Sequence, residues 1–242
     1  MLVICNEMPR SGSTLQYNIC RGIVEKLDMG KGEGFFYENQ LLPLLDKFLE
    51  WGQDDRFHII KIHAFHPKTV EMTLTGWVKI CYIYRDIRDV AVSIKNKDKV
   101  DRKVLIDNLD AAIETDYKLK QVPNILIQKY EDVVIDVYKA IAEVDLFLGL
   151  KANEDVIKWV VQECSVENTK KVMLDLAVSS QNSQLNPSLQ AGYDPKTLLH
   201  HKHISRNSGT IGVWRVELEQ EEINLITERY KSWLIEAQYL LR

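Results

Sequence analysis

Two short segments of the chain combine residue types that bind and transfer anionic groups. The first is the hexapeptide PRSGST at residues 9–14, which follows an apolar run and precedes a stretch with helical spacing. Backbone N–H groups at such a turn point towards a bound anion, and the start of the helix adds partial positive charge. Gly12 lets the backbone approach the ligand, while Ser13 and Thr14 offer hydroxyl groups. Arg10 supplies a forked cation suited to a tetrahedral oxyanion. An ordinary polar turn is the alternative for this hexapeptide taken alone.

The second segment, YRDIRDVAVS at residues 84–93, begins where another apolar run ends. An arginine fixed at the end of a strand and a hydroxyl on the following helix can share the oxygens of one phosphate group, and Arg85 and Ser93 have these positions. For either residue alone, a surface ion pair or a solvent-facing hydroxyl is the better interpretation. Because both segments are present in order, a phosphate site is favoured.

Together the two segments resemble the signature of the sulfotransferase family. In that family a loop with the pattern PK-or-R-S-G-T/S-T ends the first strand and binds the 5′-phosphosulfate of 3′-phosphoadenosine-5′-phosphosulfate (PAPS). An arginine at the end of a central strand and a serine eight residues later grip the 3′-phosphate, and Arg85 and Ser93 match that spacing. The hexapeptide lacks the GxxxxGK[ST] pattern of nucleotide triphosphatases, so a magnesium-dependent kinase is disfavoured.

Further matches follow the order of the family's motifs. Lys61-Ile62-His63 ends a strand-like run where cytosolic sulfotransferases carry Lys-Thr-His with the catalytic histidine. A histidine at the end of a strand is often a structural residue, but here it lies at the ligand-binding edge of a parallel sheet, which favours catalysis. Tyr130-Glu131-Asp132 resembles the element whose tyrosine contacts the adenine. Gly212-Val213-Trp214-Arg215 resembles the end of the loop that closes over the 3′-phosphate.

The resemblance implies two sets of site residues and no metal. The catalytic residues it implies are His63, Lys61 and Arg10. The donor-binding residues it implies are Arg10, Ser11, Gly12, Ser13, Thr14, Arg85, Ser93, Tyr130, Arg206, Asn207 and Gly209.

The chain departs from the family pattern at both ends of the nucleotide. Asn207 and Ser208 stand where the phosphate-closing loop has Arg and Lys, and Arg206 comes one residue early. Whether Arg206 or Asn207 replaces the lost contact stays open. Leu15 and Val166 stand where many members have aromatic residues that stack on the adenine, so the adenine clamp is either weaker or built from other residues.

The elements that position these residues alternate between strands and helices. The apolar runs predict strands at 2–8, 57–63, 77–84 and 125–128. Helical spacing predicts helices at 14–27, 38–51, from near 86, at 133–148, 154–172 and 218–241. Asp86 and Asp89 have the spacing of an acidic helix-start box. The alternation predicts one α/β domain over residues 1–242, a three-layer αβα fold with a central, mostly parallel sheet and a phosphosulfate-binding turn like a P-loop. Residues 175–205 are expected to form a long loop or lid.

Composition excludes several other classes. The 31 Lys and Arg residues are outnumbered by 35 Asp and Glu residues, a net charge of −4 that disfavours a nucleic-acid binder. Neither a signal peptide nor an apolar run of membrane-spanning length is readable. Cys5 and Cys81 lie in apolar strand-like runs and are expected to be buried thiols, and the absence of a CxxC pair leaves no zinc or redox signal. A reduced, cytoplasmic protein is therefore expected. His200, His201 and His203 are expected to be solvated loop residues. The triplet Phe35-Phe36-Tyr37 lines either an acceptor pocket or the core.

These observations predict an enzyme that transfers the sulfuryl group from PAPS to a hydroxyl or amine of a small-molecule acceptor, leaving 3′,5′-adenosine bisphosphate (PAP). His63 would accept the acceptor's proton, and Arg10 and Lys61 would stabilise developing charge. Two alternatives stay open: a small-molecule kinase, and a catalytically silent nucleotide-binding protein of the same fold. The acceptor's identity and the oligomeric state cannot be predicted, since one donor site serves many acceptors.

Overall fold

A computed structural model describes residues 1–63, 65–182, 193–200 and 210–241. Five parallel strands form one sheet in the order β2-β3-β1-β4-β5. The strands are β1 (Leu2–Glu7), β2 (Gly30–Phe35), β3 (Phe57–Ile62), β4 (Val78–Tyr84) and β5 (Ile125–Lys129). β1 lies in the middle because its register pairs Asn6 with Ile62 of β3 and with Tyr82 of β4. The predicted three-layer α/β class is confirmed.

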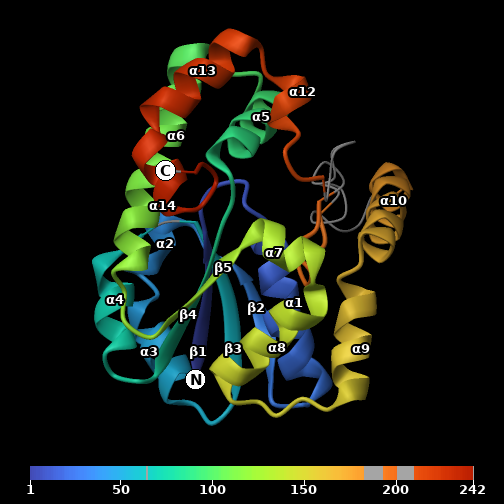
Figure 1. Ribbon diagram of the computed structural model, residues 1–242. Coiled ribbons are helices and arrows are strands. Elements are labelled where there is room, and N and C mark those ends of the chain that lie inside the picture. The colour runs from blue at the N-terminus through green and yellow to red at the C-terminus, as the bar shows by residue number, and fades with distance from the viewer. Residues whose placement is uncertain (64, 183–192, 201–209, 242) are drawn as a thin grey trace.

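Each face of the sheet is covered by its own hydrophobic core, and Figure 1 shows the two helical layers. Even-numbered residues of β1, such as Ile4, point to one core and odd-numbered ones, such as Val3, to the other, as the period of a strand requires. The first core packs against α3 (Leu45–Gln53), α4 (Pro67–Thr73), α5 (Ile87–Asp98), α6 (Arg102–Lys120), α13 (Gln220–Arg229) and α14 (Lys231–Glu236). The second packs against α1 (Ser13–Lys26), α8 (Val137–Leu148) and α9 (Glu154–Glu163). Cys5 and Cys81 are buried free thiols, as expected, and Cys20 is a third.

Several predicted helices are interrupted. The helix expected at 38–51 is split into α2 (Glu38–Leu41) and α3, with Pro43 in the turn, where its ring prevents a continuous helix. The helix expected at 133–148 is split into α7 (Tyr130–Ile135) and α8, and Asp136 caps α8 by accepting from the Lys139 N–H at 2.9 Å. The helix expected at 154–172 is split into α9 and α10 (Val166–Asn182). The single terminal helix expected at 218–241 is α13 followed by α14.

The expected long loop at 175–205 is wrong at its start, because α10 continues to Asn182. Residues 193–200 form a small hairpin in which Tyr193 pairs with His200. Residues 183–192 and 201–205 lie outside the described residues. β2, α4 and α6 were not predicted, and β2 escapes the apolar-run criterion because its sequence is GKGEGF. Among the described residues, no helix has the length and apolar character needed to cross a membrane.

Candidate active site

The carboxyl ends of β1, β3 and β4 lie side by side, and the turns that follow them carry the predicted chemistry. From β1 the chain runs to β2 and then β3 on one side, and afterwards crosses to β4 and β5 on the other side of β1. In open parallel sheets, ligands bind at such a reversal of strand order. The hexapeptide therefore follows the central strand at the point where a ligand site is expected.

Gly12 begins helix α1 in a left-handed conformation, with φ of 94°. Two features exclude a side chain at this position. The positive φ is strained for any residue other than glycine, and an added Cβ would lie 2.6 Å from the Tyr130 ring. The turn thus packs directly against the residue predicted to contact adenine. The buried hydroxyls of Ser11 and Ser13 have no hydrogen-bond partner within the described residues. Buried hydroxyls without a partner are costly, so these two atoms are suited to a polar ligand.

Arg10 and Ser93 connect the two sequence motifs. The Arg10 Nε–H donates to Ser93 Oγ over 2.9 Å. Arg85 lines the same cavity as Arg10, and its guanidinium carbon lies over the Tyr130 ring, 4.5 Å from the ring centroid. Its Nε is buried and has no hydrogen-bond partner within the described ranges. The contact with Tyr130 thus positions the Arg85 guanidinium, and its Nε–H is left available to donate to a ligand.

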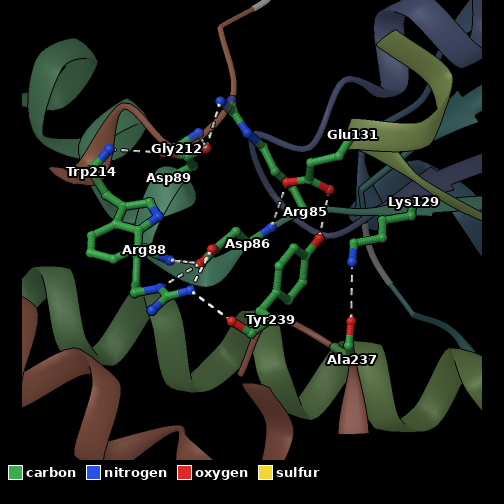
Figure 2. Close-up of polar contacts among 10 residues, drawn as sticks. All are labelled: Arg85, Asp86, Arg88, Asp89, Lys129, Glu131, Gly212, Trp214, Ala237 and Tyr239. Carbon is green, nitrogen blue, oxygen red and sulfur yellow. Dashed lines mark hydrogen bonds and ion pairs between the residues drawn. The ribbon is translucent and has the colours of Figure 1, made fainter. Parts of the chain in front are cut away.

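Asp89 ties Arg85 to the segment at 210–214, as Figure 2 shows. Its Oδ2 accepts from Arg85 Nη2 at 3.3 Å and from the Gly212 N–H at 2.8 Å. Its Oδ1 accepts from the Trp214 N–H at 3.0 Å, and Arg85 also donates to the Thr210 carbonyl at 3.0 Å. The segment predicted to close over the 3′-phosphate therefore lies next to Arg85. Arg206, Asn207 and Gly209, which belong to the same predicted loop, lie outside the described residues.

The helix-start box predicted from Asp86 and Asp89 is half right. Asp86 is the N-cap of α5 and accepts from the Arg88 N–H at 3.0 Å. Asp89 instead turns to the 210–214 segment. The reason is tertiary, because two backbone N–H groups of that segment need an acceptor at this place.

Glu131 and Tyr239 form a second set of polar contacts around Asp86, next to Arg85 (Figure 2). Glu131 accepts from the Asp86 N–H at 3.2 Å and from the Tyr239 hydroxyl at 2.6 Å. Burial raises the pKa of Glu131 and also that of Tyr239. Lys129 also contacts Tyr239, because its ammonium lies 3.8 Å from the centroid of the Tyr239 ring. These contacts attach the last part of the chain to Glu131 and Asp86, which directly follows Arg85.

Lys61 and His63 lie at the end of β3, on the other side of β1. Lys61 is buried, and its ammonium donates to Thr14 Oγ1 at 2.8 Å. Burial lowers the pKa of Lys61, an effect that the nearby Glu7 carboxylate opposes. His63 Nε2 lies 2.9 Å from Glu7 Oε1, and its imidazole packs edge-on to Phe35 with centroids 4.7 Å apart. The His63 side chain is 47% exposed, so it can meet a ligand.

Glu7 was not singled out from the sequence. Its side chain is buried, and its Oε2 accepts from the Ser13 N–H of the hexapeptide at 3.0 Å. Burial alone would raise the pKa of Glu7, but Lys61, His63 and the Ser13 N–H outweigh burial and hold that pKa well below its ordinary value. The sequence shows a carboxylate at the end of the strand before the turn, which could have marked Glu7 as a candidate site residue. Its contact with His63 could not be predicted from the sequence.

None of the residues Phe35, Phe36 and Tyr37 is among those that line the cavity, while Phe35 and Phe36 each pack against one of the two cores, which favours the core role for these two. Phe35 contacts both Tyr37 and His63. Phe36 packs edge-on against Phe48, a residue of the core.

One cavity of about 680 Å³ unites the two motifs. The predicted site residues that line it are Arg10, Gly12, Ser13, Thr14, Lys61, His63, Arg85, Ser93 and Tyr130. Ser11, which was also predicted to bind the donor, is fully buried and is not among the lining residues. Leu15 and Val166, the expected replacements for aromatic stackers, line it too. Cys164 lies on the same wall, and burial raises the pKa of its thiol to about 12. The wall is completed by Thr197 and Leu199 of the 193–200 hairpin.

The hairpin at 193–200 is fastened to α1. Asn18 Nδ2 donates to the Thr197 carbonyl at 2.8 Å, and the Lys196 ammonium lies 3.1 Å from Glu25. The segment expected to act as a lid is thus attached, over these eight residues, to the helix that begins at the anion-binding turn.

A phosphate-binding turn at the carboxyl edge of a parallel sheet, with cations and a histidine in one cavity, defines an α/β group-transfer enzyme that acts on an anionic donor. The sequence matches the sulfotransferase domain over residues 3–238, and the chain belongs to the sulfotransferase family. The predicted class of PAPS-dependent sulfotransferase is thereby confirmed.

Solved structures with the same fold agree with this assignment. A crystal structure of retinol dehydratase in complex with androsterone and inactive cofactor PAP gives a TM-score of 0.59 at 18% identity, over 96% of this chain and 80% of that chain. A crystal structure of mouse sulfotransferase SULT7A1 complexed with PAP gives 0.58 at 15% identity, over 96% and 84% of the respective chains. No curated protein sequence matches the chain significantly.

Proposed function

We propose that this chain transfers the sulfuryl group of PAPS to a hydroxyl or amine of a small-molecule acceptor, with the residues named from its sequence in the roles predicted for them. The observation that carries the proposal is the single cavity in which the PRSGST turn, Arg85, Ser93, Lys61 and His63 meet. The fold relatives include retinol dehydratase bound to androsterone and to retinol, which are small alcohols or ketones of largely apolar character. They support a small-molecule acceptor.

The donor fits the polar atoms that the protein leaves without partners. The Ser13 hydroxyl and Arg85 Nε are buried donors with no acceptor among the described residues, and both residues line the cavity. Ser13 belongs to the turn for the 5′-phosphosulfate, and Arg85 belongs to the site for the 3′-phosphate. Oxygens of the two groups would accept from these donors, so the complex would gain hydrogen bonds that the free protein lacks.

The roles of the chain's own residues follow from their positions. Arg10 belongs to the turn, Lys61 donates to Thr14 at its end, and both cations would stabilise the charge that develops as the sulfur–oxygen bond of the donor breaks. His63, exposed at the cavity beside Lys61, would accept the proton of the attacking hydroxyl or amine. Arg85 and Ser93 would fix the nucleotide so that the sulfuryl group faces His63.

A pair of measurements tests the proposal. Calorimetry should show that PAP binds at least about ten-fold more tightly than adenosine 5′-monophosphate, because only PAP carries the phosphate that Arg85 would grip. Radiolabelled PAPS incubated with a panel of small alcohols, phenols and amines should yield a labelled product without magnesium. Equal affinity for the two nucleotides would contradict the donor site. Magnesium-dependent turnover of ATP would favour the kinase alternative, and PAP binding without any transfer would favour the silent binder.

A further inference from the structure

Glu7 is a buried carboxylate directly beneath the anion-binding turn. Its side chain is 4% exposed at the end of the central strand. One oxygen accepts from the Ser13 N–H at 3.0 Å, and the other lies 2.9 Å from His63 Nε2. The carboxylate therefore joins two parts of the cavity, the turn after β1 and the histidine after β3.

A negative charge at this place is unfavourable for an anion site by itself. It repels a bound anion and occupies one N–H of the turn. The buried ammonium of Lys61 compensates the charge, since it and His63 hold the pKa of Glu7 well below its ordinary value. A neutral glutamine would satisfy the Ser13 N–H without that repulsion, so the hydrogen bond alone does not explain a carboxylate here.

The contact with His63 supplies an explanation. An ionised carboxylate only accepts hydrogen bonds, so the ring nitrogen that faces Glu7 must carry its hydrogen. In a neutral imidazole, a hydrogen on Nε2 leaves the lone pair on Nδ1. We propose that Glu7 is a positioning residue that fixes His63 in the Nε2–H tautomer, so that Nδ1 is the nitrogen that accepts the acceptor's proton. This inference rests on the proposed function, because it assigns a direction to the proton transfer suggested there.

The proton and electron balance of the step is simple. As the acceptor oxygen forms its bond to sulfur, its O–H bond breaks and the proton moves to His63 Nδ1. The sulfur–oxygen bond to the nucleotide breaks, and its electron pair leaves with PAP. Glu7 keeps its negative charge throughout and stabilises the imidazolium that forms, as the carboxylate of a histidine-based triad does.

The tautomer can be measured without knowing the acceptor. In the wild-type protein labelled with ¹⁵N at histidine, long-range ¹H–¹⁵N NMR at a pH where His63 is neutral should show a protonated Nε2 and an unprotonated Nδ1. Comparison with His63→Asn assigns the signals. A predominant Nδ1–H tautomer, or an even mixture of the two, would overturn the inference even if the protein transfers sulfate.

The variant Glu7→Gln separates positioning from simple support of the fold. A glutamine side chain can donate to His63 and so no longer enforces one tautomer, and we expect turnover to fall on the order of 10²–10⁴-fold. PAP affinity should stay the same or rise a few-fold, because a negative charge near the donor is removed. A purely structural carboxylate would instead lower PAP affinity and turnover together, or leave the tautomer unchanged.

Asp116→Asn is the matched control. Asp116 is a buried carboxylate on α6 that accepts from the Tyr82 hydroxyl and from Trp233 Nε1, and it is not among the residues that line the cavity with His63. It should lose stability but keep the tautomer of His63 and the turnover of the folded protein. If Glu7→Gln does not fold, the wild-type NMR measurement still decides the question. If PAP does not bind the wild-type protein at all, the proposed function fails. The tautomer of His63 can still be measured in that case, so the two outcomes are distinguishable.

Discussion

Arg10 and Ser93, which lie 83 residues apart in the sequence, are joined by a 2.9 Å hydrogen bond from the guanidinium Nε to the hydroxyl. The bond links the turn after β1 with the helix after β4. The two motifs that the sequence presents separately thus form one polar surface across the sheet edge. Ser93 Oγ accepts this bond, so its own O–H stays available to donate to a phosphate, but only as a neutral donor. Arg85 Nε, which has no partner among the described residues, offers a charged donor, and hydrogen bonds to charged groups are the stronger ones.

Arg85→Ala should therefore weaken PAP binding more than Ser93→Ala does. Loss of a charge-assisted contact worth about 1.5–3 kcal/mol lowers affinity roughly ten- to a hundred-fold. Calorimetry with PAP measures both variants. Arg102, an exposed arginine paired with Glu221, is the control, and Arg102→Ala should bind PAP as the wild type does. Unchanged affinity in Arg85→Ala would remove the basis for the 3′-phosphate site.

His63→Ala should separate binding from transfer. The imidazole lies beside Lys61 and is exposed to the cavity, so PAP affinity should stay within a few-fold. Transfer should fall about 10²–10⁴-fold, the usual contribution of a positioned base. His66→Ala, at the start of α4 and outside the cavity lining, should keep its activity. Wild-type transfer by His63→Ala would make His63 structural, as would unfolding of that variant.

Asp89→Asn should loosen the 210–214 segment from Arg85. The buried Asp89 carboxylate serves two backbone N–H groups and one guanidinium, and an amide cannot accept all three as well. We expect the free energy of unfolding in urea to fall by about 1–3 kcal/mol and PAP affinity to fall about ten-fold. The exposed Asp110, which pairs with Arg229, offers Asp110→Asn as a control with unchanged PAP affinity. Wild-type PAP affinity in Asp89→Asn would mean that this segment has no part in the donor site.

Asn18→Ala should free the 193–200 hairpin from α1. The variant loses the 2.8 Å hydrogen bond to the Thr197 carbonyl, so local opening becomes less costly. Limited trypsin digestion should cut after Lys196 several-fold faster than in the wild type, and saturating PAP should slow the cut if the hairpin covers the donor. Mass spectrometry of the fragments measures both rates. Identical cutting with and without PAP would show that the hairpin is a surface feature only.

Acid should destabilise the protein partly through Glu7. A carboxyl whose pKa is lowered in the folded state stabilises the fold above its ordinary pKa of 4.5, and this stabilisation is lost as the pH falls below that value. The free energy of unfolding should therefore decline from about pH 6 to about pH 3, and less steeply in Glu7→Gln. Urea unfolding at several pH values gives both slopes. Parallel declines would show that other groups account for the acid sensitivity.

The sequence alone was sufficient for features that depend on neighbouring residues. The turn at 9–14 and the pair Arg85 and Ser93 were readable because a strand end, a glycine and a helix start lie within a few positions of one another. The alternation of strands and helices likewise determined the α/β class. β2 was missed because a glycine-rich edge strand buries little apolar surface and so has no apolar run.

Only the tertiary structure decided which distant groups meet. Glu7 reaches His63 because parallel pairing places the ends of β1 and β3 side by side, with Asn6 opposite Ile62. Asp89 accepts from Gly212 and Trp214 because the chain returns across the sheet edge more than a hundred residues later. Local propensity carries no information on such contacts, since strand register and the return of the chain are set by packing of the two cores. The motifs could thus be predicted, while the residues that orient them could not.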